Sequence, residues 1–301
     1  QIAAKTTLMK RILISVVLAA ICLSSFGQKQ EEKKKFQIKG QPIVTVFANY
    51  HAGIGNANKE SGFALDRAYL GYQFSLTEKL SGKVVFDMGS TKVSGSDLER
   101  VAYIKNAMLS WKTGNFTLDF GLIGLEQFNV QEKFWGYRYI MKSFQDEYKF
   151  GSSADMGILG KYKFTKWLSA DITISNGEGY KKLNGDNKYR YAVGATILPV
   201  KNLTIRTYYD LASKNIEGDE TKDQQNLAFF AGYKHELFSI GAEYNQMYNT
   251  KFKEDNDQSG FSVYSTIKLE DQFNLFGRYD NLGSKDDWSS ADGQRILVGI
   301  Q

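Results

Sequence analysis

Apolar and polar residues alternate along most of the chain, in segments of about ten residues, the length that a tilted membrane-spanning strand needs. In the segment 203–211, Ile205 and Leu211 share one face, whereas Arg206 and Asp210 share the other. Because successive residues of a strand point to opposite faces, each segment has one apolar and one polar side. The pattern predicts fourteen strands, which start near Ile43, Phe63, Leu80, Val101, Phe116, Ala154, Trp167, Lys188, Leu203, Asn226, Leu237, Gly260, Phe273 and Gln294.

The connections between these segments alternate between short turns and long polar loops. The short ones are 77–79, 112–115, 165–166, 199–202, 235–236 and 270–272. The long ones are 53–62, 89–100, 176–187, 213–225, 249–259 and 283–293. A soluble β-sandwich shows the same residue alternation, but short turns on one side and long loops on the other are typical of outer-membrane barrels. Aromatic residues on the apolar face gather at the strand ends, as interfacial girdles do.

These observations predict an all-β fold, an antiparallel transmembrane β-barrel over residues 43–301, with fourteen strands visible. The strand near Val101 fits least well, because either register places Lys105 or Asn106 on the lipid face. The last segment stops in mid-strand at Gln301, where barrels of this class usually end on an aromatic residue. We therefore expect the sequence to be truncated at its C-terminus and the complete barrel to have sixteen strands, an even number.

The N-terminus is predicted to be an export signal. Residues 1–27 combine the basic Met9-Lys10-Arg11, an apolar run from Ile12 to Cys22 and small residues before a cleavage site after Gly27, which is typical of a signal peptide with an upstream extension. The apolar run is shorter than the roughly 20 residues that a spanning helix needs. Lipidation of Cys22 is the alternative, which the bulky Ile21 disfavours. Residues 28–42 are predicted to be a polar tether.

Composition and charge narrow the function further. The chain has 14% aromatic residues, 28 Gly and only 2 Pro, which suits β-structure. Three basic residues and no acid lie within residues 1–27, so the net charge of +5 falls to +2 on cleavage. That charge is too small for nucleic-acid binding, which needs a strong basic face. The mature chain would contain no cysteine and hence no disulfide.

One connection is much longer than the others. Residues 125–153 show no strand pattern, and a loop of this length is usually functional. We expect its aromatic residues to anchor it against the inner wall of the barrel, so that it narrows the lumen. The predicted pore constriction then consists of Glu132, Lys133, Arg138 and Lys142. The alternative is a surface loop over the barrel mouth.

The polar faces of the strands supply the predicted pore lining. Its residues are Arg67, Lys83, Asp87, Asp119, Asp171, Arg190, Arg206, Asp210 and Arg278. The two charge signs nearly balance, which predicts weak ion selectivity, because a ring of charge sets ion preference when one sign dominates. Each of these residues has a second interpretation, as one half of a structural ion pair in the lumen.

Nothing in the sequence indicates catalysis. His51 and His235, the only histidines, are expected at opposite ends of the barrel, so neither completes a nucleophile–base pair. No Cys/His spacing fits a metal site, and no glycine-rich loop fits a nucleotide. The sequence therefore predicts that the protein is not an enzyme and binds no cofactor or metal.

Three stretches carry a resemblance to a known family. Residues 63–72 (FALDRAYLGY), 133–141 (KFWGYRYIM) and 151–157 (GSSADMG) resemble outer-membrane porins of the phosphate-selective porin O/P type. The resemblance covers most of residues 36–301 and implies a sixteen-stranded homotrimer with a basic constriction. The family's phosphate selectivity depends on clustered lysines, whereas only Lys133, Arg138 and Lys142 are central here, so phosphate specificity does not follow.

The sequence therefore predicts a porin of the bacterial outer membrane, a water-filled channel for passive diffusion of ions and small polar solutes. Its expected partners are outer-membrane lipid, small hydrophilic solutes or anions, and two further copies of the chain in a homotrimer. Two alternatives are a substrate-specific channel for phosphate or oligosaccharide, and a non-conducting barrel that serves as an adhesin or structural anchor.

Overall fold

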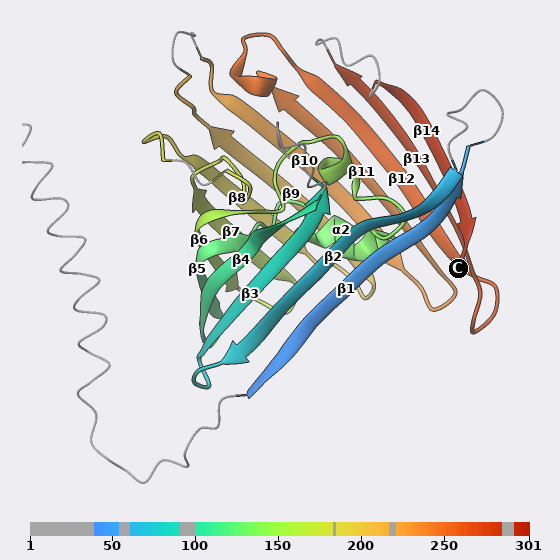
Figure 1. Ribbon diagram of the computed structural model, residues 1–301, viewed down its shortest axis with the longest axis horizontal. Coiled ribbons are helices and arrows are strands. Elements are labelled where there is room, and N and C mark those ends of the chain that lie inside the picture. Colours follow the sequence, from blue (N-terminus) through green and yellow to red (C-terminus); the bar gives the residue numbers. More distant parts are fainter. Residues whose placement is uncertain (1–38, 54–60, 91–99, 183–184, 217–220, 285–291) are drawn as a thin grey trace, which may run out of the picture. The chain divides into compact units, whose positions relative to one another are not determined.

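The computed structural model describes residues 39–53, 61–90, 100–182, 185–216, 221–284 and 292–301 of the 301-residue chain. The predicted signal peptide, and the predicted tether as far as residue 38, lie outside these residues. The described chain forms one antiparallel sheet of fourteen strands, in which the spatial order follows the sequence (Figure 1). All-β architecture is therefore confirmed, and so are the fourteen predicted strands.

The strands are β1 (Lys39–Ala52), β2 (Ser61–Ser75), β3 (Leu80–Ser90), β4 (Arg100–Thr113), β5 (Phe116–Gly124), β6 (Ala154–Lys163), β7 (Leu168–Ser175), β8 (Arg190–Ile197), β9 (Leu203–Ala212), β10 (Gln224–Lys234), β11 (Phe238–Tyr248), β12 (Gln258–Lys268), β13 (Asn274–Ser284) and β14 (Gly293–Ile300). Two short helices, α2 (Asn129–Trp135) and α3 (Phe144–Glu147), lie between β5 and β6, and a 3-10 turn, η1 (Thr250–Phe252), follows β11.

The sheet curls around a lumen that contains α2 (Figure 1). Each strand pairs with the next in sequence, and among the described strands β1 pairs with β2 alone and β14 with β13 alone. The expectation of sixteen strands stays a prediction.

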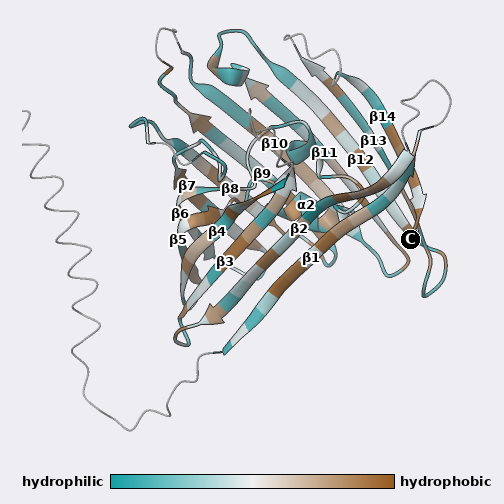
Figure 2. Cartoon of the chain, viewed as in Figure 1, coloured by the Kyte–Doolittle hydropathy of each residue, from teal (hydrophilic) through white to brown (hydrophobic). Residues whose placement is uncertain are grey.

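The two faces of the sheet have opposite polarity. Outward-facing apolar residues are exposed, such as Ile172 with 62% and Val193 with 48% of their surface accessible, whereas the inward-facing Asp171, Thr173 and Asp210 are buried. Apolar bands alternate with polar positions along the strands (Figure 2). An apolar outer wall and a polar interior are the arrangement of a membrane barrel. Within the described residues no helix is both long and apolar enough to cross a membrane.

Aromatic rings gather at both ends of the outer wall. Near the short turns, Trp111 packs against Phe116 and Tyr162 against Phe164, with ring centroids 6.2 and 4.8 Å apart. Towards the long loops, further ring pairs are Tyr50–Phe63, Tyr189–Tyr191 and Phe261–Tyr279. These pairs lie where interfacial girdles are expected.

A β-bulge in β4 resolves the ambiguous register of that strand. Val85 of β3 pairs with Asn106, and Phe86 pairs with Ile104, so Lys105 is an extra residue. An extra residue in one strand changes which side the following residues face. Both Lys105 and Asn106 therefore reach the lumen, where the Lys105 Nζ donates to Tyr69 Oη at 3.1 Å and Asn106 is 5% exposed. On β4, Ile104 therefore faces the lipid, and the charge of Lys105 does not.

Candidate pore constriction

The 125–153 loop folds into the lumen and crosses to the opposite wall. The aromatic residues around α2 pack against inward-facing rings of β10, β12 and β13. The ring centroids are 5.3 Å apart for Phe134–Phe230 and for Trp135–Tyr264, and 4.1 Å apart for the stacked pair Tyr137–Phe276. Edge-to-face and offset-stacked rings at these distances stabilise each other beyond the burial of their area.

A second aromatic group fixes the α3 end of the loop. Phe144 and Phe150 are completely buried, and they form a cluster with Tyr148, Met247 and Leu282. Full burial of a phenylalanine side chain stabilises a fold by roughly 1.5–3 kcal/mol. Two such residues hold the loop more firmly than any exposed contact could.

Glycines on the inner wall provide the space for these rings. A Cβ atom added at Gly232 of β10 would lie 2.5 Å from Phe134 Cε2, and one added at Gly260 of β12 would lie 2.6 Å from Phe144 Cζ. These distances are shorter than any real contact between side-chain carbons. The wall and the loop are therefore matched in shape.

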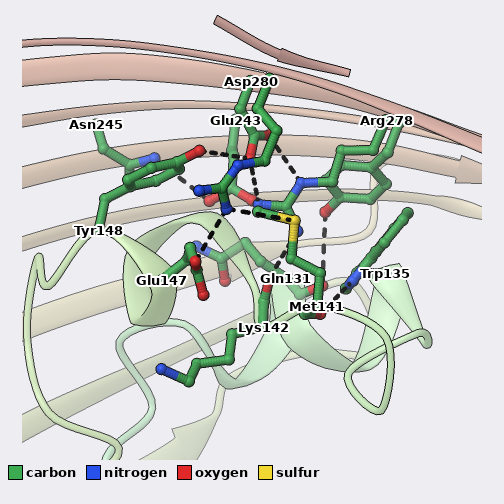
Figure 3. Close-up of polar contacts among 12 residues, drawn as sticks. Gln131, Trp135, Met141, Lys142, Glu147, Tyr148, Glu243, Asn245, Arg278 and Asp280 are labelled. Carbon is green, nitrogen blue, oxygen red and sulfur yellow. Dashed lines mark hydrogen bonds and ion pairs between the residues drawn. The ribbon is translucent and has the colours of Figure 1, made fainter. Parts of the chain in front are cut away.

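Arg278 links the loop to the wall by polar contacts (Figure 3). Its Nη1 donates to the Lys142 carbonyl oxygen at 2.6 Å, its Nε and Nη2 donate to the Asp280 carboxylate at 2.7 and 2.8 Å, and its guanidinium lies 5.1 Å from the Trp135 ring. Tyr148 Oη also donates to Asp280, at 3.1 Å. Burial, together with the charge of Asp280, raises the pKa of Tyr148 to about 12, so this phenol keeps the proton that it donates.

On the other side of α2 the lumen is open. A cavity of about 430 Å³ lies between the loop and the wall formed by β2 to β5. Its charged lining residues are Lys83, Lys105, Asp119, Glu126, Glu132 and Lys161. A second cavity of about 440 Å³ shares Glu126 and Lys161 with the first and reaches the short turn at Lys112–Asn115.

The predicted pore-lining residues all lie on the inner face, and all except Lys83 are engaged in ion pairs. The pairs are Arg67–Asp87 (3.3 Å), Lys161–Asp119 (3.1 Å), Arg206–Asp171 (2.8 Å), Arg190–Asp210 (3.0 Å) and Arg278–Asp280 (2.7 Å). The interpretation as structural ion pairs therefore describes eight of the nine. Paired opposite charges contribute little net field to the passage, which leaves the field to the unpaired residues.

Two of the four predicted constriction residues are bonded to each other. Arg138 Nε lies 2.9 Å from Glu132 Oε2, and Arg138 Nη2 lies 2.9 Å from Asp146 Oδ2. Burial raises the pKa of the Glu132 carboxyl, although Arg138 beside it acts in the opposite direction. Lys142 lines a separate cavity of about 460 Å³, between the loop and strands β1, β2 and β14.

The fourth, Lys133, belongs to a group of three lysines. Lys83 of β3, Lys105 of β4 and Lys133 of α2 are near enough for the positive charges of the latter two to act on Lys83. None of the three forms an ion pair with another residue that the structure describes. Glu132, on the loop side of the passage, lies within electrostatic range of Lys105.

Sequence reasoning did not select Lys105, Glu126 or Tyr180 as site residues. Lys105 reaches the lumen only because of the bulge, for which the sequence shows no turn or glycine signal. Glu126 binds Lys161 at 3.1 Å across the base of the loop. Tyr180 lies in the β7–β8 loop and donates to Asp87 Oδ2 at 2.6 Å, a contact between residues 93 positions apart. No local pattern indicates such a contact.

The described residues contain no group of three or more His, Cys, Asp or Glu side chains that could hold a metal ion. His51 lies on β1, with Nδ1 3.2 Å from Asn49 Oδ1, and His235 lies in the turn after β10, where its Nδ1 accepts from the Leu237 N–H at 3.3 Å.

No protein-family model matches this sequence, and no curated protein matches it. The likeness to the phosphate-selective porin O/P family is therefore unconfirmed.

Several solved outer-membrane proteins are similar to this chain in structure. An OmpT of Vibrio cholerae that lacks loop L8 is 14% identical with a TM-score of 0.46, and the match covers 88% of this chain and 98% of that one. The trimer form of in-vitro folded OmpT from the same organism is 12% identical with a TM-score of 0.43, covering 88% and 97%. Salmonella typhi OmpF in complex with daunomycin is 15% identical with a TM-score of 0.46, covering 87% and 96%.

The prediction that the chain is not an enzyme is contradicted by this set of solved outer-membrane proteins. OmpT, an outer membrane protein of Vibrio cholerae, occurs in it repeatedly. The absence of a catalytic motif near His51 and His235 is too weak to exclude enzymatic activity.

Proposed function

We propose that the protein is a porin of the bacterial outer membrane, a water-filled channel through which ions and small polar solutes diffuse passively. One observation carries the proposal: the inward loop is anchored on one wall and leaves a cavity of about 430 Å³ against the other. A loop that merely filled the barrel would contact both walls. Here the aromatic contacts of α2 are with β10, β12 and β13, and charged side chains line the opposite side.

The same arrangement favours anions. Within the part of the chain that the structure describes, Lys83, Lys105 and Lys133 line or border the passage and form no ion pair, although the charge of Asp119 reaches Lys83. The acids Asp119 and Glu126 share Lys161, and Glu132 binds Arg138. Unpaired charges of one sign determine the ion preference of a pore. The proposed channel therefore prefers small anions weakly, in contrast to the balance expected from the inward-facing charges alone.

The test is planar-bilayer conductance of the refolded protein, with the reversal potential measured in a potassium chloride gradient. Discrete current steps are expected, and they should come in groups of three if the channel is a homotrimer. The sign of the reversal potential is expected to be that of an anion-selective channel. Replacement of Lys83, Lys105 and Lys133 together by Gln removes three positive charges and is expected to abolish the anion preference while the steps persist. The matched control is Lys268→Gln, which removes a lysine from an exposed ion pair with Asp271 near a short turn.

Absence of current from correctly folded, heat-modifiable protein would contradict the channel and favour the non-conducting anchor. A cation-selective wild type, or a triple variant with an unchanged reversal potential, would contradict the role of the lysines. Block of the current by an oligosaccharide would instead favour a substrate-specific channel.

A further inference from the structure

A second loop also reaches into the lumen, above the cavity that the 125–153 loop leaves open. The β7–β8 loop is bound to the start of β6, where the Tyr180 N–H donates to the Ala154 carbonyl oxygen at 3.0 Å. The Tyr180 side chain then extends to β3, and its Oη donates to Asp87 Oδ2 at 2.6 Å. The phenol therefore bridges from β6 to β3 across the loop ends of β4 and β5.

The backbone of this loop is built to hold Tyr180 in place. The two Asp155 carboxylate oxygens accept hydrogen bonds from the Gly177 N–H at 2.6 Å and the Gly179 N–H at 3.2 Å. Both glycines have positive φ, +90° and +78°, a region that other residues rarely adopt. A Cβ atom at Gly179 would also lie 2.6 Å from Ser152 Oγ. The inward path of the chain is thus fixed by a buried acid and two glycines.

The bridge lies at the long-loop end of the lysine passage. Asp87 pairs with Tyr103 of β4 and with Tyr69 of β2, so these residues form one row across the inner wall. The next row towards the short turns contains Lys105 and Asn106, which line the cavity. The Tyr180 ring lies beside the first of these lysines, since its centre is 5.9 Å from Lys105 Nζ.

The surroundings of the bridge are basic. Arg67 Nη1 lies 3.3 Å from Asp87 Oδ2, and this arginine and Lys105 both donate to Tyr69 Oη, at 3.0 and 3.1 Å. Lys181 Nζ lies 4.8 Å from the centre of the Tyr103 ring, so its charge also faces this row. Asp87 is the acid of the group, and Arg67 neutralises it. Anions are therefore attracted to an opening that the Tyr180 ring narrows.

We propose that Tyr180 is a specificity-determining residue of the channel: its bridge to Asp87 narrows the long-loop entrance of the lysine passage and limits the size of the anions that enter. This inference rests on the proposed channel function. Removal of the ring widens the entrance without removing any of the basic residues, so it relaxes the size limit and retains the preference for anions.

The test compares the gluconate conductance with the chloride conductance of single channels. Tyr180→Ala is expected to raise the ratio of gluconate to chloride conductance on the order of twofold, since pore diameter controls which solutes pass. Tyr180→Phe keeps the ring and loses the hydrogen bond, and a smaller increase is expected. Gly179→Ala leaves Tyr180 intact but displaces it through the contact with Ser152, and it is expected to act in the same direction.

Tyr191→Ala is the matched control, because it removes a tyrosine ring from the outer, lipid-facing side of β8. Its conductance ratio is expected to equal that of the wild type. A wild type that conducts, together with unchanged ratios in folded Tyr180→Ala and Tyr180→Phe, would overturn the role of Tyr180 and leave the channel function intact. A folded wild type that does not conduct would overturn both.

Discussion

Arg206 is 2% exposed, and its guanidinium binds both oxygens of Asp171, at 2.8 and 3.1 Å, and Thr196 Oγ1 at 3.0 Å. A buried ion pair of this kind contributes little net stability compared with apolar residues of the same size, because both charges are desolvated. Loss of one partner is costly, since the other charge is then buried alone. The lumen pairs should therefore behave as units.

Arg206→Met tests this behaviour. The change leaves Asp171 buried without a partner and is expected to lower the free energy of unfolding by about 3–5 kcal/mol. The measurement is urea unfolding in lipid, followed by the gel mobility of folded and unfolded protein. The double variant Arg206→Met/Asp171→Leu removes both charges and should recover most of the loss. A double variant as unstable as the single one would show that packing, and not the unpaired charge, is responsible.

The sequence indicated which side of the sheet these residues face, but not which residues they bind. Arg206 on β9 and Asp171 on β7 carry opposite charges. The alternation of polar and apolar residues is enough to predict that both side chains face the lumen. Their pairing depends on the side-by-side registers of β7, β8 and β9. Lys105 shows the same limit, because one inserted residue in β4 changes the face on which it lies.

Among the elements, the strands could be predicted from the sequence, whereas the short helices within the 125–153 loop could not. Each strand carries its own signal, a period of two between turn residues. Helix α2 has seven residues, too few to be stable alone, and no side chain caps its N-terminus. Its stability comes from the rings of Phe230, Tyr264 and Phe276 on β10, β12 and β13, which lie far away in the sequence. Local patterns therefore identified the loop by its length and its aromatic residues, without its helices.

Two arginines bind this loop to the wall, and they allow a matched comparison. Arg278 is 4% exposed and binds the Lys142 carbonyl and Asp280, whereas the side chain of Arg295 is 45% exposed and binds Glu147 at 2.9 Å. Arg278→Gln is expected to destabilise the fold by about 3–5 kcal/mol, because Asp280 loses its partner. Arg295→Gln is expected to cost less than about 1 kcal/mol, because water screens an exposed pair.

The loosened loop should also be visible in the current. Single-channel recordings of Arg278→Gln are expected to show more frequent transitions between current levels than the wild type, whereas Arg295→Gln should resemble the wild type. Equal current noise in both variants would mean that the aromatic packing of Phe134, Trp135 and Phe144 is sufficient to fix the loop.

For the whole molecule, charge pairing decides what a permeating ion experiences. The inner wall carries many charges, but most are neutralised by a neighbour on the adjacent strand, on the same strand or, for Arg206 and Asp171, two strands away. Beside the cavity between the loop and strands β2 to β5, the remaining field comes from Lys83, Lys105 and Lys133 on one side and the partly neutralised acids of the loop on the other. The sequence offers only a count of inward-facing charges. That count is nearly balanced, and it does not reveal the field that remains after the charges have paired.

The acids of the loop make this field depend on pH, and they differ in their pKa. Burial raises the pKa of Glu132 above its ordinary value of 4.5. Burial also acts to raise the pKa of Glu126, but the charge of Lys161 and the hydrogen bonds from Asn129 and Lys161 together outweigh it and hold the pKa below that value. A carboxyl with a raised pKa takes up its proton first as the pH falls. As the pH falls, Glu132 therefore loses its negative charge before Glu126 does.

The net charge along the passage becomes more positive as Glu132 is neutralised, so the anion preference should increase as the pH falls from about 7 towards about 4.5. The measurement is the reversal potential in a potassium chloride gradient over this range. Glu132→Gln should show a larger anion preference at pH 7 and a nearly flat pH profile. Glu126→Gln, the matched control, should shift the preference at every pH and keep the wild-type slope. A wild-type slope that survives in Glu132→Gln would assign the pH dependence to other carboxyls and contradict the place of Glu132 beside the passage.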